Sequence, residues 1–208
     1  MIDPATLDWD KVDGLIPAVV QDAASGEVRM LGYVDREALD ATLRDGFVTF
    51  HSRSRGRLWR KGESSGNVLE VVDVRSDCDR DALLILARPH GPTCHTGAVS
   101  CFGNDGSPGT GFLADLARLI GERAGADPAE SYTARLLAGG VKRISQKVGE
   151  EGVEVALAAV AGDAAEVTAE TADLVYHLSV LLQAAGSSWE EVTAELRRRH
   201  ASSASASS

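Results

Sequence analysis

The stretch Gly103-Asn104-Asp105-Gly106-Ser107-Pro108-Gly109-Thr110-Gly111 divides the chain into two halves with different sequence patterns. Glycine and proline interrupt helices and strands, and segments rich in glycine and serine are typical of flexible linkers. A chain of 208 residues is long enough for two domains of roughly 100 residues each. We therefore expect a first domain over residues 1–103, a linker over 104–111 and a second domain over 112–200.

Before this stretch, the pattern predicts an α+β domain made mostly of strands. Short apolar runs rich in Val, Leu and Phe are separated by turn residues, and Ser25-Gly26 is a hairpin signal between the first two runs. Asp35 is a suitable N-cap for a short helix over 35–44, and Gly46 follows the end of that helix. The predicted strands are residues 18–23, 28–34, 47–51, 68–74 and 82–87.

After the stretch, the pattern predicts an all-α helical bundle. Asp127-Pro128-Ala129-Glu130 has the cap, proline and acid of a helix N-terminus, and Gly139-Gly140 would end that helix. A long helix is expected over 141–161, and Asp163 with Glu166 is expected to cap another that continues to Ala185. The last helix is expected to begin at Ser188.

The composition restricts the cellular compartment and the kinds of binding partner that we expect for this protein. The formal net charge is −10, so neither nucleic acid nor an anionic membrane is an expected partner. No apolar run approaches the ~20 residues that span a bilayer. Three cysteines, an odd number, argue against a disulfide framework, and we expect a cytoplasmic protein with reduced thiols. Residues 201–208 contain only Ala and Ser and are expected to be disordered.

All three cysteines lie beside polar or potentially liganding residues. They occur in Asp77-Cys78-Asp79-Arg80-Asp81, in Cys94-His95-Thr96-Gly97 and in Ser100-Cys101-Phe102. Thiolates favour zinc, and a catalytic zinc site uses three protein ligands while leaving one position open for water. His95 is a candidate fourth ligand or a nearby acid/base. The spacing alone leaves two alternatives open, a closed structural zinc site and cysteines that are simply buried.

The aspartates around Cys78 indicate a second, harder metal. Asp77, Asp79 and Asp81 alternate, so an extended segment would direct all three to one side. An EF-hand loop is excluded, because its sixth position is Ala82 rather than glycine and its twelfth is Arg88 rather than glutamate. Magnesium held by a few carboxylates and waters fits better, and a solvated acidic turn is the alternative.

Residues 14–103 closely resemble the phosphoribosyl-AMP cyclohydrolase family, whose members open the purine ring in histidine biosynthesis. The resemblance rests on these acidic and thiol motifs and on further stretches that the family shares. His51 departs from the family pattern, in which an aromatic residue is expected before Ser52. The further stretches are Ser52-Arg53-Ser54-Arg55, Leu58-Trp59-Arg60-Lys61-Gly62-Glu63 and Ser65-Gly66-Asn67.

The resemblance implies roles for these residues. It implies zinc bound by Cys78, Cys94 and Cys101, with one thiol contributed by a partner subunit, and a catalytic part for His95. It also implies magnesium at Asp77, Asp79 and Asp81. Five cations between Arg53 and Lys61 are enough to hold a phosphate. The residues expected to bind substrate here are Ser52, Arg53, Ser54, Arg55, Trp59 and Lys61.

In the second half, two pairs of acidic residues are expected to face each other. Glu151 and Glu154 are three apart and share one helix face, and Glu170 and Asp173 repeat this spacing on the next helix. Antiparallel packing across a turn at Gly162 would bring the pairs together into a cage of four carboxylates. Like charges on one face destabilise a helix unless a cation lies between them. Two solvated faces are the alternative.

Residues 112–200 resemble the phosphoribosyl-ATP pyrophosphatase family, which belongs to the all-α nucleoside-triphosphate pyrophosphatases. The resembling stretches are Ser131-Tyr132-Thr133, Gly140-Val141-Lys142-Arg143, Lys147-Val148-Gly149-Glu150-Glu151 and Ala172-Asp173-Leu174-Val175-Tyr176-His177. The resemblance implies magnesium at Glu151, Glu154, Glu170 and Asp173, with Glu151 also catalytic. Lys142, Arg143 and Lys147 are expected phosphate contacts.

The sequence therefore predicts a bifunctional hydrolase that acts on phosphoribosyl nucleotides and uses zinc and magnesium. Its second domain would convert phosphoribosyl-ATP to phosphoribosyl-AMP, whose adenine ring the first domain would open. We expect a homodimer with sites shared between subunits, because the helices carry much apolar surface. One rival function is the removal of non-canonical nucleotides, although the H-x-E and P-C-x-x-C motifs of zinc deaminases are absent. The other rival is a non-enzymatic scaffold with a structural zinc.

Overall fold

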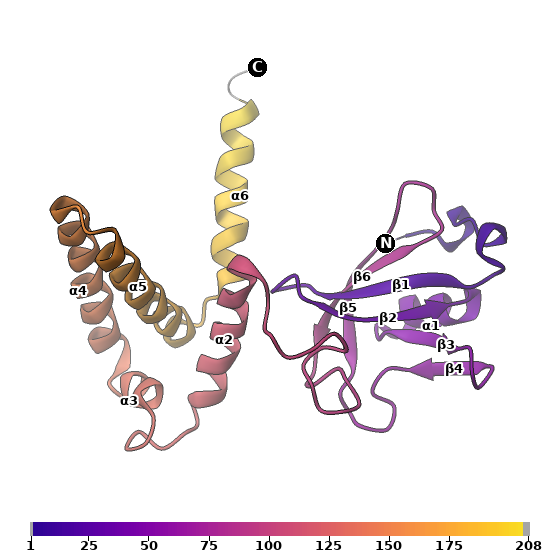
Figure 1. The fold of residues 1–208 in the computed structure, drawn as a ribbon, viewed down its shortest axis with the longest axis horizontal. Coiled ribbons are helices and arrows are strands. Elements are labelled where there is room, and N and C mark those ends of the chain that lie inside the picture. Colours follow the sequence, from indigo (N-terminus) through magenta and orange to yellow (C-terminus); the bar gives the residue numbers. More distant parts are fainter. Residues whose placement is uncertain (1, 206–208) are drawn as a thin grey trace. The chain divides into compact units, whose positions relative to one another are not determined.

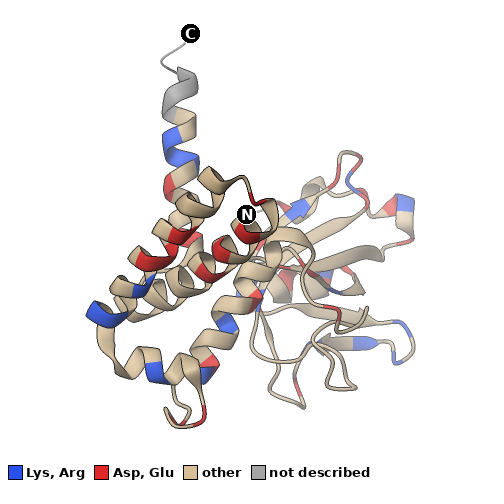
Figure 2. Ribbon diagram, turned by 60° about the vertical axis from the view of Figure 1, so that its left-hand side comes forward, with Lys and Arg blue, Asp and Glu red and all other residues tan. Residues whose placement is uncertain are grey.

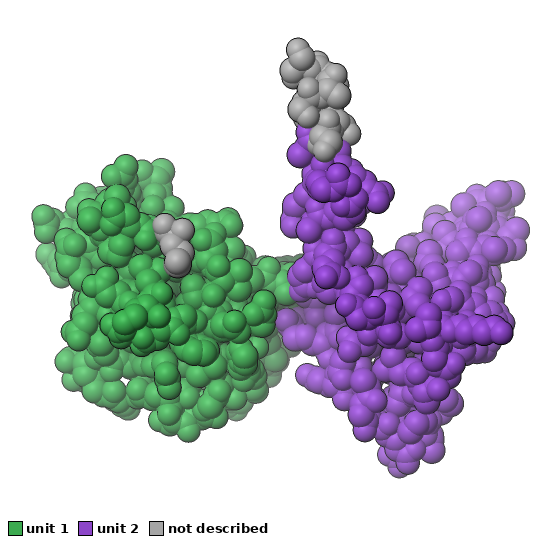
Figure 3. Space-filling model, turned by 180° about the vertical axis from the view of Figure 1, so that it is seen from behind, with its two compact units in different colours: residues 1–112 green, residues 113–208 purple. Residues whose placement is uncertain are grey.

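The computed structural model describes residues 2–205, and the side chains of residues 2–201. The chain separates into two compact units, residues 1–112 and residues 113–208 (Figure 3). The first is built mostly of strands and the second of helices, which confirms the predicted fold class (Figure 1). No described helix is both long and apolar enough to cross a membrane.

A four-stranded mixed sheet organises the first unit. Its strands are β1 (Ile16–Asp22), β2 (Val28–Val34), β5 (Leu69–Ser76) and β6 (Leu83–Pro89), in the order β2-β1-β6-β5. β1 pairs antiparallel with β2 and parallel with β6, and β6 pairs antiparallel with β5. Every second residue of β1 is buried, as expected for a strand that turns one face to the core.

A short second sheet, β3 (Thr49–Ser52) with β4 (Arg57–Arg60), completes the core. α1 (Arg36–Asp45) is capped by Asp35, whose carboxylate accepts from the amide of Ala38, and it ends at Gly46 in the left-handed conformation. Phe50 is fully buried, and its ring stacks on Trp59 with centroids 5.8 Å apart. The same ring lies against Gly32, where an added Cβ would approach it to 2.4 Å.

Short 3-10 helices occur at both ends of the first unit. η1 (Pro4–Thr6) and η2 (Asp10–Val12) precede the sheet, and buried Trp9 lies between them. η3 (Gly109–Gly111) falls within the glycine-rich segment expected to be a linker. Part of that segment packs on the β1–β2 hairpin: Ser107 is buried, and a Cβ on Gly111 would lie 2.1 Å from the carbonyl oxygen of Ser25.

Over residues 113–205, the described part of the second unit, the regular elements are all helices. These are α2 (Phe112–Arg123), α3 (Tyr132–Ala138), α4 (Gly140–Ala161), α5 (Ala164–Ala185) and α6 (Trp189–Ser205). α4 and α5 form an antiparallel pair across the left-handed Gly162, as the sequence predicts (Figure 1). A small core of Ile120, Leu136, Ile144 and Val180 joins α2 to α5.

Three helices differ from the predictions. Asp127 caps only a single turn, and α3 begins later, where the Ser131 hydroxyl accepts from the amide of Ala134. α2 was not predicted at all. α6 begins with the expected reciprocal cap between Ser188 and Glu191 and runs to Ser205, into the segment for which disorder is predicted. Residues 206–208 of that segment lie outside the described residues.

Candidate functional sites

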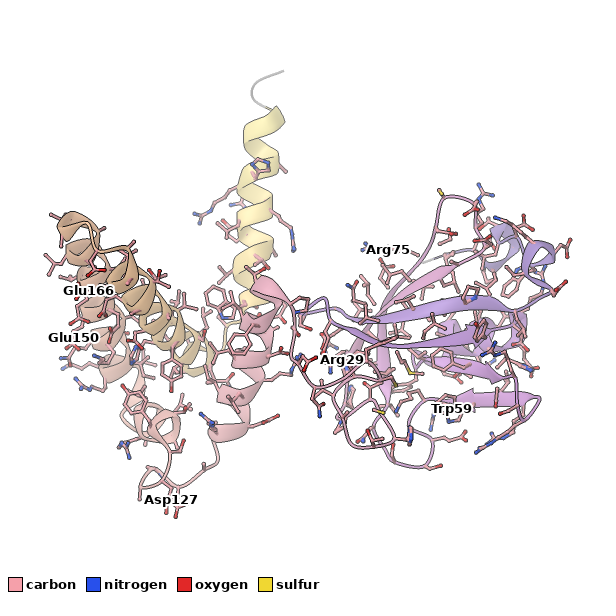
Figure 4. All side chains as sticks on the ribbon, viewed as in Figure 1. Arg29, Trp59, Arg75, Asp127, Glu150 and Glu166 are labelled. Atoms are coloured by element: carbon pink, nitrogen blue, oxygen red, sulfur yellow. The ribbon has the colours of Figure 1, made fainter. Side chains whose placement is uncertain are left out.

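The first unit contains a pocket of about 620 Å³ between the β3–β4 hairpin and the loops that follow β4 and β6. It brings together most of the residues singled out in this half of the sequence. Arg29 of β2 and Trp59 of β4 project from strands of this unit (Figure 4). The predicted site residues that line the pocket are Ser52, Ser54, Arg55, Trp59, Lys61, Cys94, His95 and Cys101.

Two of the three cysteines lie together in this pocket. The Thr96 hydroxyl donates to the Cys94 sulfur over 3.2 Å and lowers the pKa of that thiol, which favours the thiolate. Burial raises the pKa of the Cys101 thiol, and the neighbouring Cys94 raises it further. The amide of Cys101 donates to the carbonyl of Arg29 over 2.8 Å, so β2 holds this loop in place.

The third cysteine does not join them within one chain. Cys78 is exposed on the β5–β6 loop, where its sulfur lies 3.9 Å from Oδ1 of Asp79, and it does not line the pocket. Within residues 2–201, no cysteine belongs to a group of three potential ligands whose atoms all lie within 4.8 Å of one another. Among the described residues, the three thiols therefore do not converge within one chain.

His95 lies beside Cys94 in the pocket lining. Its Nδ1 is 3.8 Å from the Cys94 sulfur, and the ring is exposed in the pocket. This placement leaves the imidazole free to approach a bound molecule, as a proton-transferring group must.

The expected phosphate-binding residues divide into three groups. Ser52, Ser54 and Arg55 line the pocket at its rim. Arg53 instead stacks over the ring of Tyr33, with its guanidinium carbon 3.8 Å from the centroid. Lys61 is 7% exposed and donates to the carbonyl of Asn67 over 3.3 Å.

Burial lowers the pKa of Lys61, and the nearby thiols of Cys101 and Cys94 oppose this effect. Its ammonium thus belongs to the floor of the pocket beside the two cysteines. Met30 and Thr93 also line the pocket, and the sequence alone gave no sign of either residue.

The β5–β6 loop carries the acidic triad, defined as Asp77, Asp79 and Asp81. One carboxylate oxygen from each lies within 4.8 Å of the others. Oδ1 of Asp77 accepts from the amides of Asp81 and Ala82 over 3.0 and 3.1 Å, which closes the loop. The ammonium of Lys11 contacts both Asp79 and Asp81, and it lowers the pKa of Asp79. Three converging carboxylate oxygens are a donor set that fits a hard metal ion such as magnesium.

A second acidic cluster lies on the α4–α5 pair, whose ribbon carries several red segments in Figure 2. Glu151, Glu154 and Glu170 each place an oxygen within 4.8 Å of the others. Asp173, the fourth predicted ligand, does not join this group of described residues, although it lies on the same helix as Glu170. Oxygen ligands at this spacing suit magnesium, and here too an ammonium, that of Lys147, is already bound.

Glu151 is the most buried of these carboxylates, at 4% exposed. Lys147 donates to it over 2.7 Å and lowers its pKa, so Glu151 is a carboxylate at neutral pH. Glu154 shows the opposite effect, because the adjacent Glu151 raises its pKa. Lys147 also contacts Glu150 over 2.9 Å, which leaves its ammonium shared between two glutamates. Figure 4 labels Glu150 on α4 and Glu166 on α5.

A hydrogen-bonded aromatic group borders this cluster. His177 is buried, and its Nδ1 lies 2.8 Å from the carbonyl oxygen of Asp173 and 3.6 Å from Oε1 of Glu151. A carbonyl oxygen only accepts, so Nδ1 carries a hydrogen, and in the neutral ring Nε2 accepts from the Tyr132 hydroxyl at 3.0 Å. Tyr132 is not among the predicted site residues, although it lies in a stretch that resembles the family. Lys142 and Arg143 are exposed at the start of α4.

The two sites define a two-domain enzyme. Residues 30–103 match the phosphoribosyl-AMP cyclohydrolase family, and residues 113–200 match the phosphoribosyl-ATP pyrophosphohydrolase family. The chain belongs to the family of histidine biosynthesis bifunctional proteins HisIE.

Relatives that carry this name align over nearly the whole chain. The protein of Photobacterium profundum is 57% identical over 200 residues, which is 94% of this chain and 97% of the relative. That of Escherichia coli K12 is 58% identical over 194 residues, covering 93% and 95%. That of Pasteurella multocida is 57% identical over 197 residues, covering 93% and 98%.

Proposed function

We propose that this chain catalyses two hydrolyses, with the second unit acting first. The second unit would hydrolyse phosphoribosyl-ATP to phosphoribosyl-AMP and pyrophosphate. The first unit would then add water across the N1–C6 bond of the adenine ring and open it. The observation that carries the proposal is that each family match contains its own cluster of potential ligands, with a pocket beside the thiols of the first unit.

The thiols of the first unit would hold zinc. Cys94 and Cys101 would bind from one subunit and Cys78 from its partner, which accounts for the separation of Cys78 within one chain. The lowered pKa of Cys94 supports this assignment, because the thiolate is the form that binds metal. Zinc, when bound, lowers the pKa of a coordinated water to about 7.

The protein groups of this pocket would orient the substrate and move the proton. His95 would give a proton to the departing ring nitrogen, and its exposed position beside Cys94 suits this role. Ser52, Ser54 and Arg55 would hold the phosphate, with Trp59 against the base or ribose. Arg53 and Lys61 are further candidates for binding, although Lys61 lies deeper, beside the thiols. Asp77, Asp79 and Asp81 would bind magnesium, which can neutralise phosphate charge.

In the second unit, Glu151, Glu154 and Glu170 would hold magnesium. Asp173, on the same helix as Glu170, would complete the ligand set when the ion binds, and magnesium would neutralise charge on the triphosphate. Glu151 would accept the proton of the water that attacks the α-phosphorus. Its ionised carboxylate is buried next to the oxygens of Glu154 and Glu170, where a magnesium-associated water would lie, and this position supports that role. The phosphates would be contacted by Lys142, Arg143 and Lys147. Lys147 would then replace one of its two glutamate contacts with a contact to a phosphate oxygen.

We further propose that the protein is a cytoplasmic homodimer. One face of α4 presents Val153, Leu157 and Val160 to solvent, and Val160 is 89% exposed. These positions are spaced i, i+4 and i+7 and form an apolar stripe, which a second copy of the chain would cover. A dimer also supplies the third thiol. The odd number of cysteines and their reduced state suit the cytoplasm.

Comparing the turnover of different substrates tests the proposed function against its two rivals. Phosphoribosyl-ATP should release pyrophosphate in the presence of magnesium, whereas ATP and non-canonical nucleoside triphosphates should be turned over at least about 100-fold more slowly. Preference for the free triphosphates would indicate a nucleotide-pool enzyme instead. No pyrophosphate from any of these substrates would favour the scaffold.

A further inference from the structure

Lys11 lies outside the part of the chain that matches the cyclohydrolase family, yet it contacts that family's acidic loop. Its ammonium contacts the carboxylate of Asp79 and lies 2.5 Å from Oδ2 of Asp81, although it is about 68 residues away from them in sequence. It therefore lies among the oxygens of the acidic triad, where a divalent cation would bind.

The N-terminal segment is held against this loop by more than the charge of Lys11. The amide of Asp8 donates to the carbonyl of Arg80 over 2.9 Å, and the Arg80 guanidinium donates to the carbonyl of Thr6 over 3.4 Å. Trp9, 3% exposed, anchors the same segment in the hydrophobic core. Lys11 is thus carried by an ordered backbone.

The charges favour exchange of Lys11 for a stronger cation. Three carboxylates with one ammonium leave the triad with a net charge of about −2. A divalent ion adjacent to the same oxygens would be repelled by an ammonium that stayed in place, so the two compete. Lys11 is 44% exposed at its side chain and has solvent into which it can swing.

We propose that Lys11 is a built-in counter-cation of the acidic triad, which magnesium displaces on binding, so that Lys11 sets the affinity of this site for the metal. The inference rests on the proposed magnesium site at Asp77, Asp79 and Asp81. In the metal-free protein Lys11 offsets part of the repulsion among the three carboxylates, and once the metal arrives its charge opposes the ion.

Calorimetric titration of the full-length protein with magnesium chloride tests this proposal. The parent protein for these titrations carries Glu154→Gln and Glu170→Gln, which remove the helical cluster. The remaining binding heat then reports magnesium binding at the acidic triad. Lys11→Met keeps the aliphatic stem without the charge and should tighten magnesium binding about tenfold or more, because repulsion by a unit charge near a divalent ion is lost. Lys11→Arg keeps the charge and can pair with two carboxylate oxygens at once, so it should bind magnesium no more tightly than the parent.

Two controls separate the outcomes. Arg44→Met removes an exposed cation that pairs with Asp45, away from the acidic loop, and should leave the affinity unchanged. Asp79→Asn should abolish the binding heat. If Lys11→Met binds magnesium with equal or weaker affinity than the parent, while Asp79→Asn does not bind it, the proposed role of Lys11 is wrong. The metal site at the acidic triad would then still be supported. Binding that Asp79→Asn does not alter would instead remove the proposed site and the inference with it.

Discussion

The ammonium of Lys147 lies 2.7 Å from Oε1 of buried Glu151, one helical turn away on α4. This contact lowers the pKa of Glu151 below its ordinary value of 4.5. The stability that the pair contributes is therefore present above that ordinary value and is lost as the pH falls through the lowered pKa of the folded state.

Lys147→Met should reduce the free energy of unfolding by about 1–2 kcal/mol at neutral pH, because it leaves the Glu151 carboxylate buried without its partner. The difference from the parent should shrink as the pH falls through the lowered pKa of Glu151, where its carboxylate becomes protonated. Urea unfolding in a chelating buffer at several pH values measures both. Lys142→Met, at an exposed position on the same helix, is the matched control. A difference that does not change with pH would contradict this assignment.

Mixing two inactive variants tests whether the thiol site is shared between subunits. Cys78→Ser and Cys94→Ser homodimers should each lack zinc and ring-opening activity. After subunit exchange, half of the dimers should be mixed and hold one complete site, which restores about a quarter of the parent activity. Zinc content should recover in parallel. Mixtures that stay inactive although exchange is demonstrated would exclude a site built from two chains.

The apolar stripe on α4 should be part of the dimer contact. Leu157→Glu places a charge at an exposed apolar position and should shift the protein toward monomer, as measured by light scattering. Glu166→Lys changes a charge on α5 at an exposed position and should leave the dimer intact. A Leu157→Glu protein that remains dimeric at the same concentration would place the interface elsewhere.

Gly32 should be essential for the packing of the first unit. A Cβ at this position would approach two ring atoms of buried Phe50 to 2.4 Å, so Gly32→Ala should destabilise the protein by about 1–3 kcal/mol. Gly66→Ala tests a glycine that has open space but a positive φ of 77°, where the cost is backbone strain alone. Denaturant unfolding that shows the Gly32 variant as stable as the parent would contradict this packing argument.

The sequence identifies the elements whose signals are local. The hairpin at Ser25-Gly26, the Asp35 cap and the Gly162 turn depend on single residues with strong preferences, and the structure contains all three. β4 was missed because Arg57–Arg60 is charged at both ends and pairs only through β3. α2 was missed because it directly follows a glycine-rich segment. Its apolar face is buried by packing against Leu136 and Ile144, which are distant in sequence.

The sequence predicts those parts of the two sites for which the residue type alone indicates the chemical role. Thiols, histidine and paired carboxylates can be recognised in a sequence, whereas their distances depend on packing. Cys78 precedes β6 and Cys94 follows it, so the length of this extended strand separates the two thiols within one chain. The contact of Lys11 with the acidic triad joins residues about 68 positions apart, and it depends on how Trp9 anchors the N-terminal segment.

Assigning each reaction to its own unit is the most direct measurement of the central claim. Full-length protein is incubated with phosphoribosyl-ATP, magnesium and zinc while pyrophosphate release and the ultraviolet change of ring opening are followed together. Cys94→Ser should release pyrophosphate at the parent rate and accumulate phosphoribosyl-AMP. Glu151→Gln should release pyrophosphate at least about 100-fold more slowly, yet open the ring of added phosphoribosyl-AMP normally. Ring opening that survives in Cys94→Ser, or pyrophosphate release that survives in Glu151→Gln, would contradict the account.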